Sequence, residues 1–211
     1  GIGPEIAARA LADPAVISRA RILLIGHAGI MEKAVELTGT QMQVRAVSEV
    51  SGARFEQGII DLIHLESDIQ EDISPGRVSA RAGDLAFRAV HKAILLALEK
   101  KVDGTVTGPI NKEALNLAGH KFAGHTEIYA HFTGTKKYAM LLAEGNFRVI
   151  HVSTHVSLRE ACDLVKKDRI LEVTRLMDQA LRNMGLPNPR IGVAGLNPHS
   201  GDGGLFGFEE E

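Results

Sequence analysis

Two histidines stand where a metal ligand would be expected. His155 ends the apolar run 147–155, and His199 follows the run 189–196, which also has the composition of a strand. Because open α/β sheets bind ligands at the carboxyl ends of their strands, both imidazoles are candidate ligands of a divalent metal. A catalytic metal takes about three protein ligands, and no third one is obviously placed here. The pair predicts half of a metal site, and phosphate binding without a metal remains the alternative.

His151 lies four residues before His155, the spacing that puts two zinc ligands on one helix face in HExxH sites. The β-branched residues between them favour a strand instead, on which the two histidines would lie about 13 Å apart. We therefore expect His151 to be a packed or hydrogen-bonded histidine of a sheet.

A Gly-Pro pair precedes a lysine in "TGPINKEAL" (107–115). A strand is expected to end at the pair and a helix to begin near Ile110, so the N–H groups of that helix and the ammonium of Lys112 would face an anion. The alternative for Lys112 is a solvated position on the helix surface.

A second glycine-rich loop, "AGHKFAGHTEIYA" (118–130), contains two Gly-His pairs. Thr126 is expected to cap a helix that starts near Glu127, which places His125 and Thr126 at a helix N-terminus suited to phosphate or carboxylate. The alternative is a capping threonine beside a histidine that bonds its own loop.

Strand-like and helix-like segments alternate along the chain, which is the βαβ pattern of an α/β fold. The expected strands are 21–26, 43–47, 59–65, 103–108, 138–144, 147–155 and 189–196. The expected helices are 3–13, 27–37, 79–101, 110–118, one from about 127, 157–165 and 168–184. The Gly-Asn turn at 145–146 predicts a hairpin and hence a mixed sheet, and 40–76 is expected to hold an inserted or antiparallel piece. No linker divides the chain, so any two domains are expected to interleave.

Composition narrows the class of protein. The 211 residues are 45% hydrophobic and carry a net charge of −2, without a basic stripe for nucleic acid. The single cysteine, Cys162, excludes an intrachain disulfide framework, and no apolar run is long enough for a membrane helix. We expect a soluble cytoplasmic protein that acts on a small molecule.

Five motifs carry a resemblance to a known family: "GIGPEI", "TGPINKEAL", "GHTE", "STHVSLRE" and "GLNPHSGDGG". In this order and spacing they resemble the 4-hydroxythreonine-4-phosphate dehydrogenases of pyridoxine (vitamin B6) biosynthesis and their D-threonate and D-erythronate 4-phosphate relatives. The resemblance runs from the first residue to the last. It implies a three-layer α/β/α architecture with two interleaved domains, as in isocitrate and isopropylmalate dehydrogenases.

The resemblance also implies an activity. Such enzymes are homodimers with a shared active site, and they oxidise the 3-hydroxyl of a phosphorylated four-carbon acid with NAD before the product loses CO₂. By this similarity His155 and His199 match two of three metal ligands (Zn, Mg, Mn or Co), while His125 and Thr126 match a substrate-binding pair. Lys112 is the candidate catalytic residue. The loop "GGLFG" favours threonate or erythronate phosphate over 4-phosphohydroxy-L-threonine.

The family pattern extends beyond this chain at both ends, so residues 1–211 are expected to be part of a truncated two-domain enzyme. The third metal ligand and most of the nucleotide site are expected in the missing C-terminal portion, and no GxGxxG fingerprint is present here. Two alternatives stay open: a metallohydrolase or phosphotransferase that uses the same histidines, and a non-catalytic homologue that binds a phosphorylated ligand.

Overall fold

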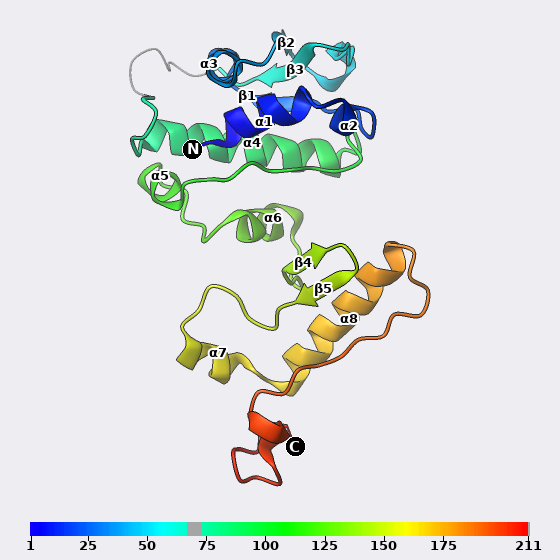
Figure 1. Cartoon of the computed structure of the whole chain (residues 1–211). Helices are drawn as coiled ribbons and strands as arrows, with labels where there is room; N and C mark the ends of the chain where they lie inside the picture. The colour runs from blue at the N-terminus through cyan, green and yellow to red at the C-terminus, as the bar shows by residue number, and fades with distance from the viewer. Residues whose placement is uncertain (67–72, 211) are drawn as a thin grey trace. The chain divides into compact units, whose positions relative to one another are not determined.

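The computed structural model describes residues 1–66 and 73–210 and divides the chain into two compact units, Gly1–Gly134 and Thr135–Glu211 (Figure 1). Both helices and strands are present throughout, so the predicted α/β class is confirmed. Each unit is described here by itself.

A three-stranded parallel sheet in the order β1-β3-β2 lies in the first unit. Its strands are β1 (Leu24–Gly26), β2 (Gln43–Val47) and β3 (Ile59–His64). The central strand β3 is the most apolar of the three, and Ile60, Leu62 and Ile63 are almost fully buried. Burial on both faces is what a central parallel strand requires. The expected antiparallel piece between 40 and 76 is therefore wrong for β2 and β3; residues 67–72 of that segment lie outside the described residues.

The first hydrophobic cluster packs two helices around the central strand. The helices are α1 (Gly3–Leu11) and α3 (Ala28–Thr38), with the short α2 (Pro14–Ile17) after α1. The cluster comprises Ala8, Leu11, Met31, Ala34, Ile60 and Leu62. Pro4 lies in the first turn of α1, where its missing N–H breaks no hydrogen bond, because the first N–H groups of a helix have no partner inside it.

One buried charge is held in this sheet. The Asp61 carboxylate is 1% exposed and accepts two hydrogen bonds from the Arg45 guanidinium, at 2.6 and 3.0 Å. The backbone N–H groups of Arg54 and Phe55 also donate to it, at 2.9 and 2.8 Å. These donors, the Arg45 guanidinium foremost, hold the pKa of Asp61 below its ordinary value. The carboxylate thus ties the short helix η1 (Val50–Gly52) and the loop after it to the sheet.

A second cluster joins three helices, α4 (Ala80–Leu98), α5 (Lys112–Leu117) and α6 (His125–Thr133). Its buried members are Val90, Ile94, Leu115 and Ile128. The helix predicted from Ser79 to Lys101 is confirmed as α4, and the Ser79 hydroxyl caps it. A Cβ at Gly83 would lie 2.0 Å from the carbonyl oxygen of Ala114, so the α4 and α5 backbones are in direct contact there.

The second unit contains a hairpin and two helices. The strands β4 (Leu141–Glu144) and β5 (Phe147–Ile150) pair antiparallel across the predicted Gly-Asn turn. They are followed by α7 (Leu158–Leu164), α8 (Lys167–Asn183) and the short helix η2 (Pro198–Gly201). The buried hydrophobic side chains described in this unit are Val173, Met177 and Leu181, which form one stripe along α8.

Two predicted strands, 103–108 and 189–196, are wrong: both segments are irregular and belong to no helix or strand. A strand needs a hydrogen-bonded neighbour, and neither segment has one among residues 1–66 and 73–210. Val106 is fully exposed and Val193 is 63% exposed, as expected of apolar strand positions without a packing partner. Within the same residues, no helix combines the length and apolar character needed to span a membrane.

Candidate functional site

His125 and Thr126 are the first two residues of α6, and Gly124 precedes them as the N-cap. The prediction that Thr126 caps this helix is therefore wrong, because the helix starts two residues earlier than expected. The expected placement of both residues at a helix N-terminus is confirmed. Their backbone N–H groups belong to the first turn, where the N–H groups have no carbonyl partner inside the helix.

The His125 side chain is held neutral by its surroundings. Burial lowers the pKa of His125, and its Nε2 atom is buried without a hydrogen-bond partner. A buried polar atom without a partner costs about 1–3 kcal/mol, which a ligand group bonded to it would offset. At neutral pH the ring offers one donor and one acceptor, a combination suited to a hydroxyl group of a ligand.

Lys112 lies beside the start of α6, although it belongs to α5. It is the first residue of that helix, which Asn111 caps by accepting the Ala114 N–H at 2.7 Å. The Cε atom of Lys112 lies 3.9 Å from the place that a Cβ would take at Gly124. The structure therefore brings the predicted catalytic lysine and the predicted substrate-binding pair together within the first unit.

Glu127 was missed by the sequence analysis as a member of this group. Its side chain approaches the same point at Gly124 to 3.5 Å, and its Oε2 atom is buried without a hydrogen-bond partner. The sequence could have indicated this residue, since Glu127 is the last residue of the motif "GHTE". Glu127 therefore adds a carboxylate to the corner formed by Lys112, His125 and Thr126, which already contains an ammonium group and a neutral imidazole.

The first turn of α1 packs against the Gly-Pro pair of the "TGPINKEAL" motif. A Cβ at Gly108 would lie only 3.2 Å from the Cα of Gly3, so the two backbones are in close contact there. Glu5 in this turn also has a buried carboxylate oxygen, Oε2, without a partner. Two of the five motifs are thus in backbone contact, although 100 residues of sequence separate them.

His155 belongs to the second unit and lies beyond the strand that was expected to carry it. The strand β5 ends at Ile150, so His155 is in the loop that leads to α7 rather than at the strand end. Its backbone is left-handed (φ 59°), which is uncommon for a residue with a side chain, and the side chain is exposed. The predicted cap at Ser157 is confirmed, with a full capping box to Glu160.

His199 lies in η2 rather than directly after a strand. Its backbone is left-handed, as are those of Ser200 and Asp202 (φ 54°, 52° and 47°). Backbone strain of this kind clusters at functional sites, and here it affects a predicted metal ligand and its neighbours.

The loop that carries His199 is closed by hydrogen bonds between its ends. The Asn197 N–H donates to Glu210 at 2.6 Å, and the Asn197 side-chain amide donates to Glu209 and Glu210 at 2.7 and 3.0 Å. These donations, the backbone one foremost, lower the pKa of Glu210. The glutamates at the end of the chain thereby fix the base of this loop.

His155 and His199 do not form a complete metal site. Imidazole is a suitable ligand for a divalent metal, but the residues that the structure describes hold no group of three histidine, cysteine or acidic side chains close enough to bind one. His151 is hydrogen-bonded, as predicted, because its Nδ1 lies 3.3 Å from the Met140 carbonyl, but it lies one residue beyond the end of β5.

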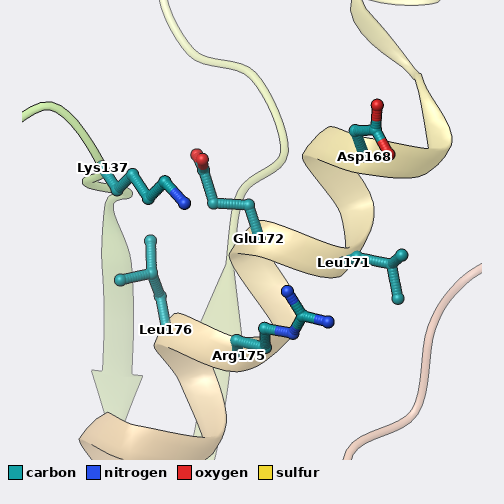
Figure 2. Close-up of a pocket in the computed structure, with 6 residues that line it drawn as sticks. All are labelled: Lys137, Asp168, Leu171, Glu172, Arg175 and Leu176. Atoms are coloured by element: carbon teal, nitrogen blue, oxygen red, sulfur yellow. The ribbon is translucent and has the colours of Figure 1, made fainter.

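A hollow in the second unit is lined by none of the predicted site residues (Figure 2). Lys137, Asp168, Glu172 and Arg175 contribute two charges of each sign, and Leu171 and Leu176 line it as well. Glu172 is already paired with Arg169, which also donates to the carbonyl groups of Tyr138 and Val152. Arg169 thus ties α8 to the segments just before β4 and just after β5.

Comparison with known proteins decides the family. The model of the family described as "Pyridoxal phosphate biosynthetic protein PdxA" matches residues 18–211. The chain belongs to the PdxA family. D-threonate 4-phosphate dehydrogenase of Cupriavidus necator is 43% identical over all of this chain, and that of Pectobacterium atrosepticum is 40% identical.

A solved member of the PdxA family has the same fold. The crystal structure of 4-hydroxythreonine-4-phosphate dehydrogenase from Klebsiella pneumoniae superposes with a TM-score of 0.89 at 44% identity, over 100% of this chain. The chain spans 63% of the Cupriavidus protein and 65% of the Klebsiella chain.

Proposed function

We propose that this protein is a dehydrogenase of a phosphorylated four-carbon hydroxy acid, with D-threonate or D-erythronate 4-phosphate preferred over 4-phosphohydroxy-L-threonine. The observation that carries the proposal is the 43% identity, over the whole chain, to a protein named D-threonate 4-phosphate dehydrogenase. The loop "GGLFG" agrees with the same preference. We further propose NAD as the oxidant, a divalent metal, loss of CO₂ from the product, and a cytoplasmic homodimer with a shared active site.

The corner formed by Lys112, His125 and Thr126 supports substrate binding in the first unit. The N–H groups of the first turn of α6 and the Lys112 ammonium are donors for a phosphate or carboxylate group. The neutral His125 ring, with its unpaired buried Nε2, is a donor or acceptor for a substrate hydroxyl. These groups would fix the orientation of the substrate, which by itself lowers the barrier to reaction.

His155 and His199 are proposed as metal ligands of the complete enzyme. The metal would supply a positive charge that lowers the pKa of a bound hydroxyl. Among the residues that the structure describes, no third histidine, cysteine or acidic side chain completes a metal site with them.

The proposal is tested by following NADH formation by the purified protein with each of the three phosphorylated acids, with and without Zn²⁺, Mg²⁺ or Mn²⁺. Turnover of D-threonate or D-erythronate 4-phosphate is expected. Calorimetry with NAD separates a dehydrogenase from a hydrolase or phosphotransferase that uses the same histidines. A protein that binds NAD but oxidises none of the three acids would contradict the substrate assignment.

A matched pair of lysine variants tests the role of the corner. Lys112→Met is expected to lower kcat/KM by about 10²-fold, the loss typical of removing one electrostatic contact to the reacting substrate. Lys33→Met, at an exposed position of α3, is the control and should leave kcat/KM unchanged. Equal activity of the two variants would remove Lys112 from the site.

A further inference from the structure

His120, which lies outside the predicted site, makes a hydrogen bond and a ring-stacking contact with α4. The His120 Nε2–H donates to Asp84 Oδ1 at 2.8 Å, across 36 residues of sequence. The same ring stacks on Phe87, with ring centroids 3.7 Å apart and planes within 13°. The His120 side chain is 22% exposed, so the contact is partly shielded from water. The other oxygen of Asp84 faces Arg88 at 3.9 Å.

His120 stands at the turn between α5 and α6. Gly119 ends α5 in a left-handed conformation (φ 88°), and its N–H donates to the Asn116 carbonyl. The His120 N–H then donates to the Leu115 carbonyl at 3.1 Å. This pair of bonds is a Schellman motif, which sets the direction in which the chain leaves the helix. From here a short loop, residues 119–124, leads directly to His125.

Helix α4 contacts this loop and the helices on both sides of it. Its Gly83 is in backbone contact with Ala114 of α5, and Phe87 packs against the second hydrophobic cluster. The ring centroid of Phe87 also lies 5.9 Å from that of Phe122, which belongs to the loop, and 5.8 Å from that of Phe132 in α6. One turn of α4 therefore contacts the helix before the loop, the loop, and the helix after it.

We propose that Asp84 and His120 are positioning residues, which hold loop 119–124 so that His125 and Thr126 begin α6 in the geometry required to bind substrate. The proposal rests on the proposed function for the role of His125 and Thr126. Neither Asp84 nor His120 needs to touch the substrate. Their contribution is to fix the chain at His120, five residues before His125, whose Nε2 atom is buried and unpaired.

Substitutions of Asp84 and His120 in the full chain test the proposal. Asp84→Ala removes the acceptor, and His120→Gln removes the stacked ring; both are expected to weaken binding of D-threonate 4-phosphate about tenfold, the loss typical of a charge-assisted hydrogen bond. Asp84→Asn keeps an acceptor oxygen and should recover most of the affinity. Asp178→Ala, an exposed aspartate paired with Arg182 on α8, is the matched control and should bind as the unaltered chain does.

The ring signal of His125 in NMR spectra gives a readout that needs no ligand. It is expected to shift in Asp84→Ala and His120→Gln, to return toward its original position in Asp84→Asn, and to stay in place in Asp178→Ala. If the unaltered chain fails to bind the phosphorylated acid, the proposed function is wrong, while the His125 signal still tests the positioning. An unchanged His125 signal in Asp84→Ala and His120→Gln, with circular dichroism showing folded protein, would overturn the proposal.

Discussion

The two units of the chain support their candidate residues in different ways. In the first unit, Lys112, His125 and Thr126 start helices that pack on a cluster of buried side chains around Leu115 and Ile128. In the second unit, His155 and His199 are exposed loop residues with left-handed backbone, and the buried hydrophobic side chains described there lie along α8 alone. The predicted substrate-binding residues are thus held by helix packing, and the predicted metal ligands are held by loop hydrogen bonds.

Because of this difference, the candidate residues of each unit should respond to different changes. Core substitutions in the first unit should disturb the substrate corner, because its helices have few alternative positions. The loops of the second unit should depend more on local contacts such as those of Asn197 and Ser157. Hydrogen exchange followed by mass spectrometry reports on each unit separately, so it is the measurement of choice for the comparison.

The largest effect is expected for Asp61→Ala. Removing the buried carboxylate leaves Arg45 and the N–H groups of Arg54 and Phe55 without their acceptor, at a cost of about 3–5 kcal/mol in the stability of the first unit. Glu56→Gln is the control, because Glu56 pairs with the same arginine but is 48% exposed, and it should cost less than about 1 kcal/mol. An increase in exchange in the second unit, relative to the unaltered chain, that is as large as the increase in the first unit would contradict the separation of the units.

Two leucines of one helix sharpen the comparison further. Leu115→Ala, at a fully buried position of α5, should destabilise the first unit by about 2–5 kcal/mol, whereas Leu117→Ala, at a 62% exposed position, should change it by less than about 0.5 kcal/mol. Urea unfolding followed by exchange measures both. Similar losses for the two variants would mean that α5 is not packed as described.

A smaller effect is expected for Leu181→Ala in the second unit. Leu181 is 5% exposed, but it packs in a unit with few other buried side chains, so the cavity can collapse and the cost should be near the low end, about 2 kcal/mol. Leu171→Ala, at a 44% exposed position of the same helix, is the control. A loss as large as that of Leu115→Ala would show that the second unit is packed as firmly as the first.

The smallest effect is a pH dependence. Burial lowers the pKa of His125, and burial together with the neighbouring His64 lowers the pKa of His27. As the pH falls, these histidines therefore bind protons in the unfolded chain before they do so in the folded chain. The free energy of unfolding of the first unit should fall as the pH drops below about 6.5 toward the lowered pKa values of the folded chain. In the second unit, hydrogen bonds lower the pKa of Glu160, and Arg182 lowers that of Asp178, so the matching loss should come only below about pH 4.5.

Hydrogen exchange measured at pH 7 and pH 5 separates the pH range in which the buried histidines titrate from the lower range of the carboxylates. His125→Gln should remove part of the loss in the first unit, because glutamine does not titrate. Equal loss in both units between pH 7 and pH 5 would contradict the assignment of that window to the buried histidines.

Much of the fold was predictable because it depends on local patterns. The apolar spacing of residues 79–101 predicted α4, and the serine before Leu158 predicted the start of α7. The segments 103–108 and 189–196 have the composition of strands, yet composition does not supply the neighbouring strand that a sheet requires. Strand pairing depends on distant segments, and these two have no partner among residues 1–66 and 73–210.

The site was predictable as a set of residues and less so as an arrangement. Lys112, His125 and Thr126 were predicted as candidates because glycine-rich loops before helices are recognisable in the sequence. The approach of Lys112 to Gly124 and the unpaired carboxylate of Glu127 depend on how α5 and α6 pack on α4, which no spacing reveals. The contact of Asp84 with His120 joins residues that are 36 positions apart, for the same reason.

Gly83 has a consequence for how this protein is mutated. Alanine scanning assumes that alanine is the neutral residue and that any loss measures what the original side chain did. At Gly83 the added methyl group would occupy the space of the Ala114 carbonyl, so alanine would force α5 away from α4 and carry His120 and the start of α6 with it. A loss of ligand binding there would report a change in the distance between two helices, so the position should be left unchanged in any library of variants of this protein.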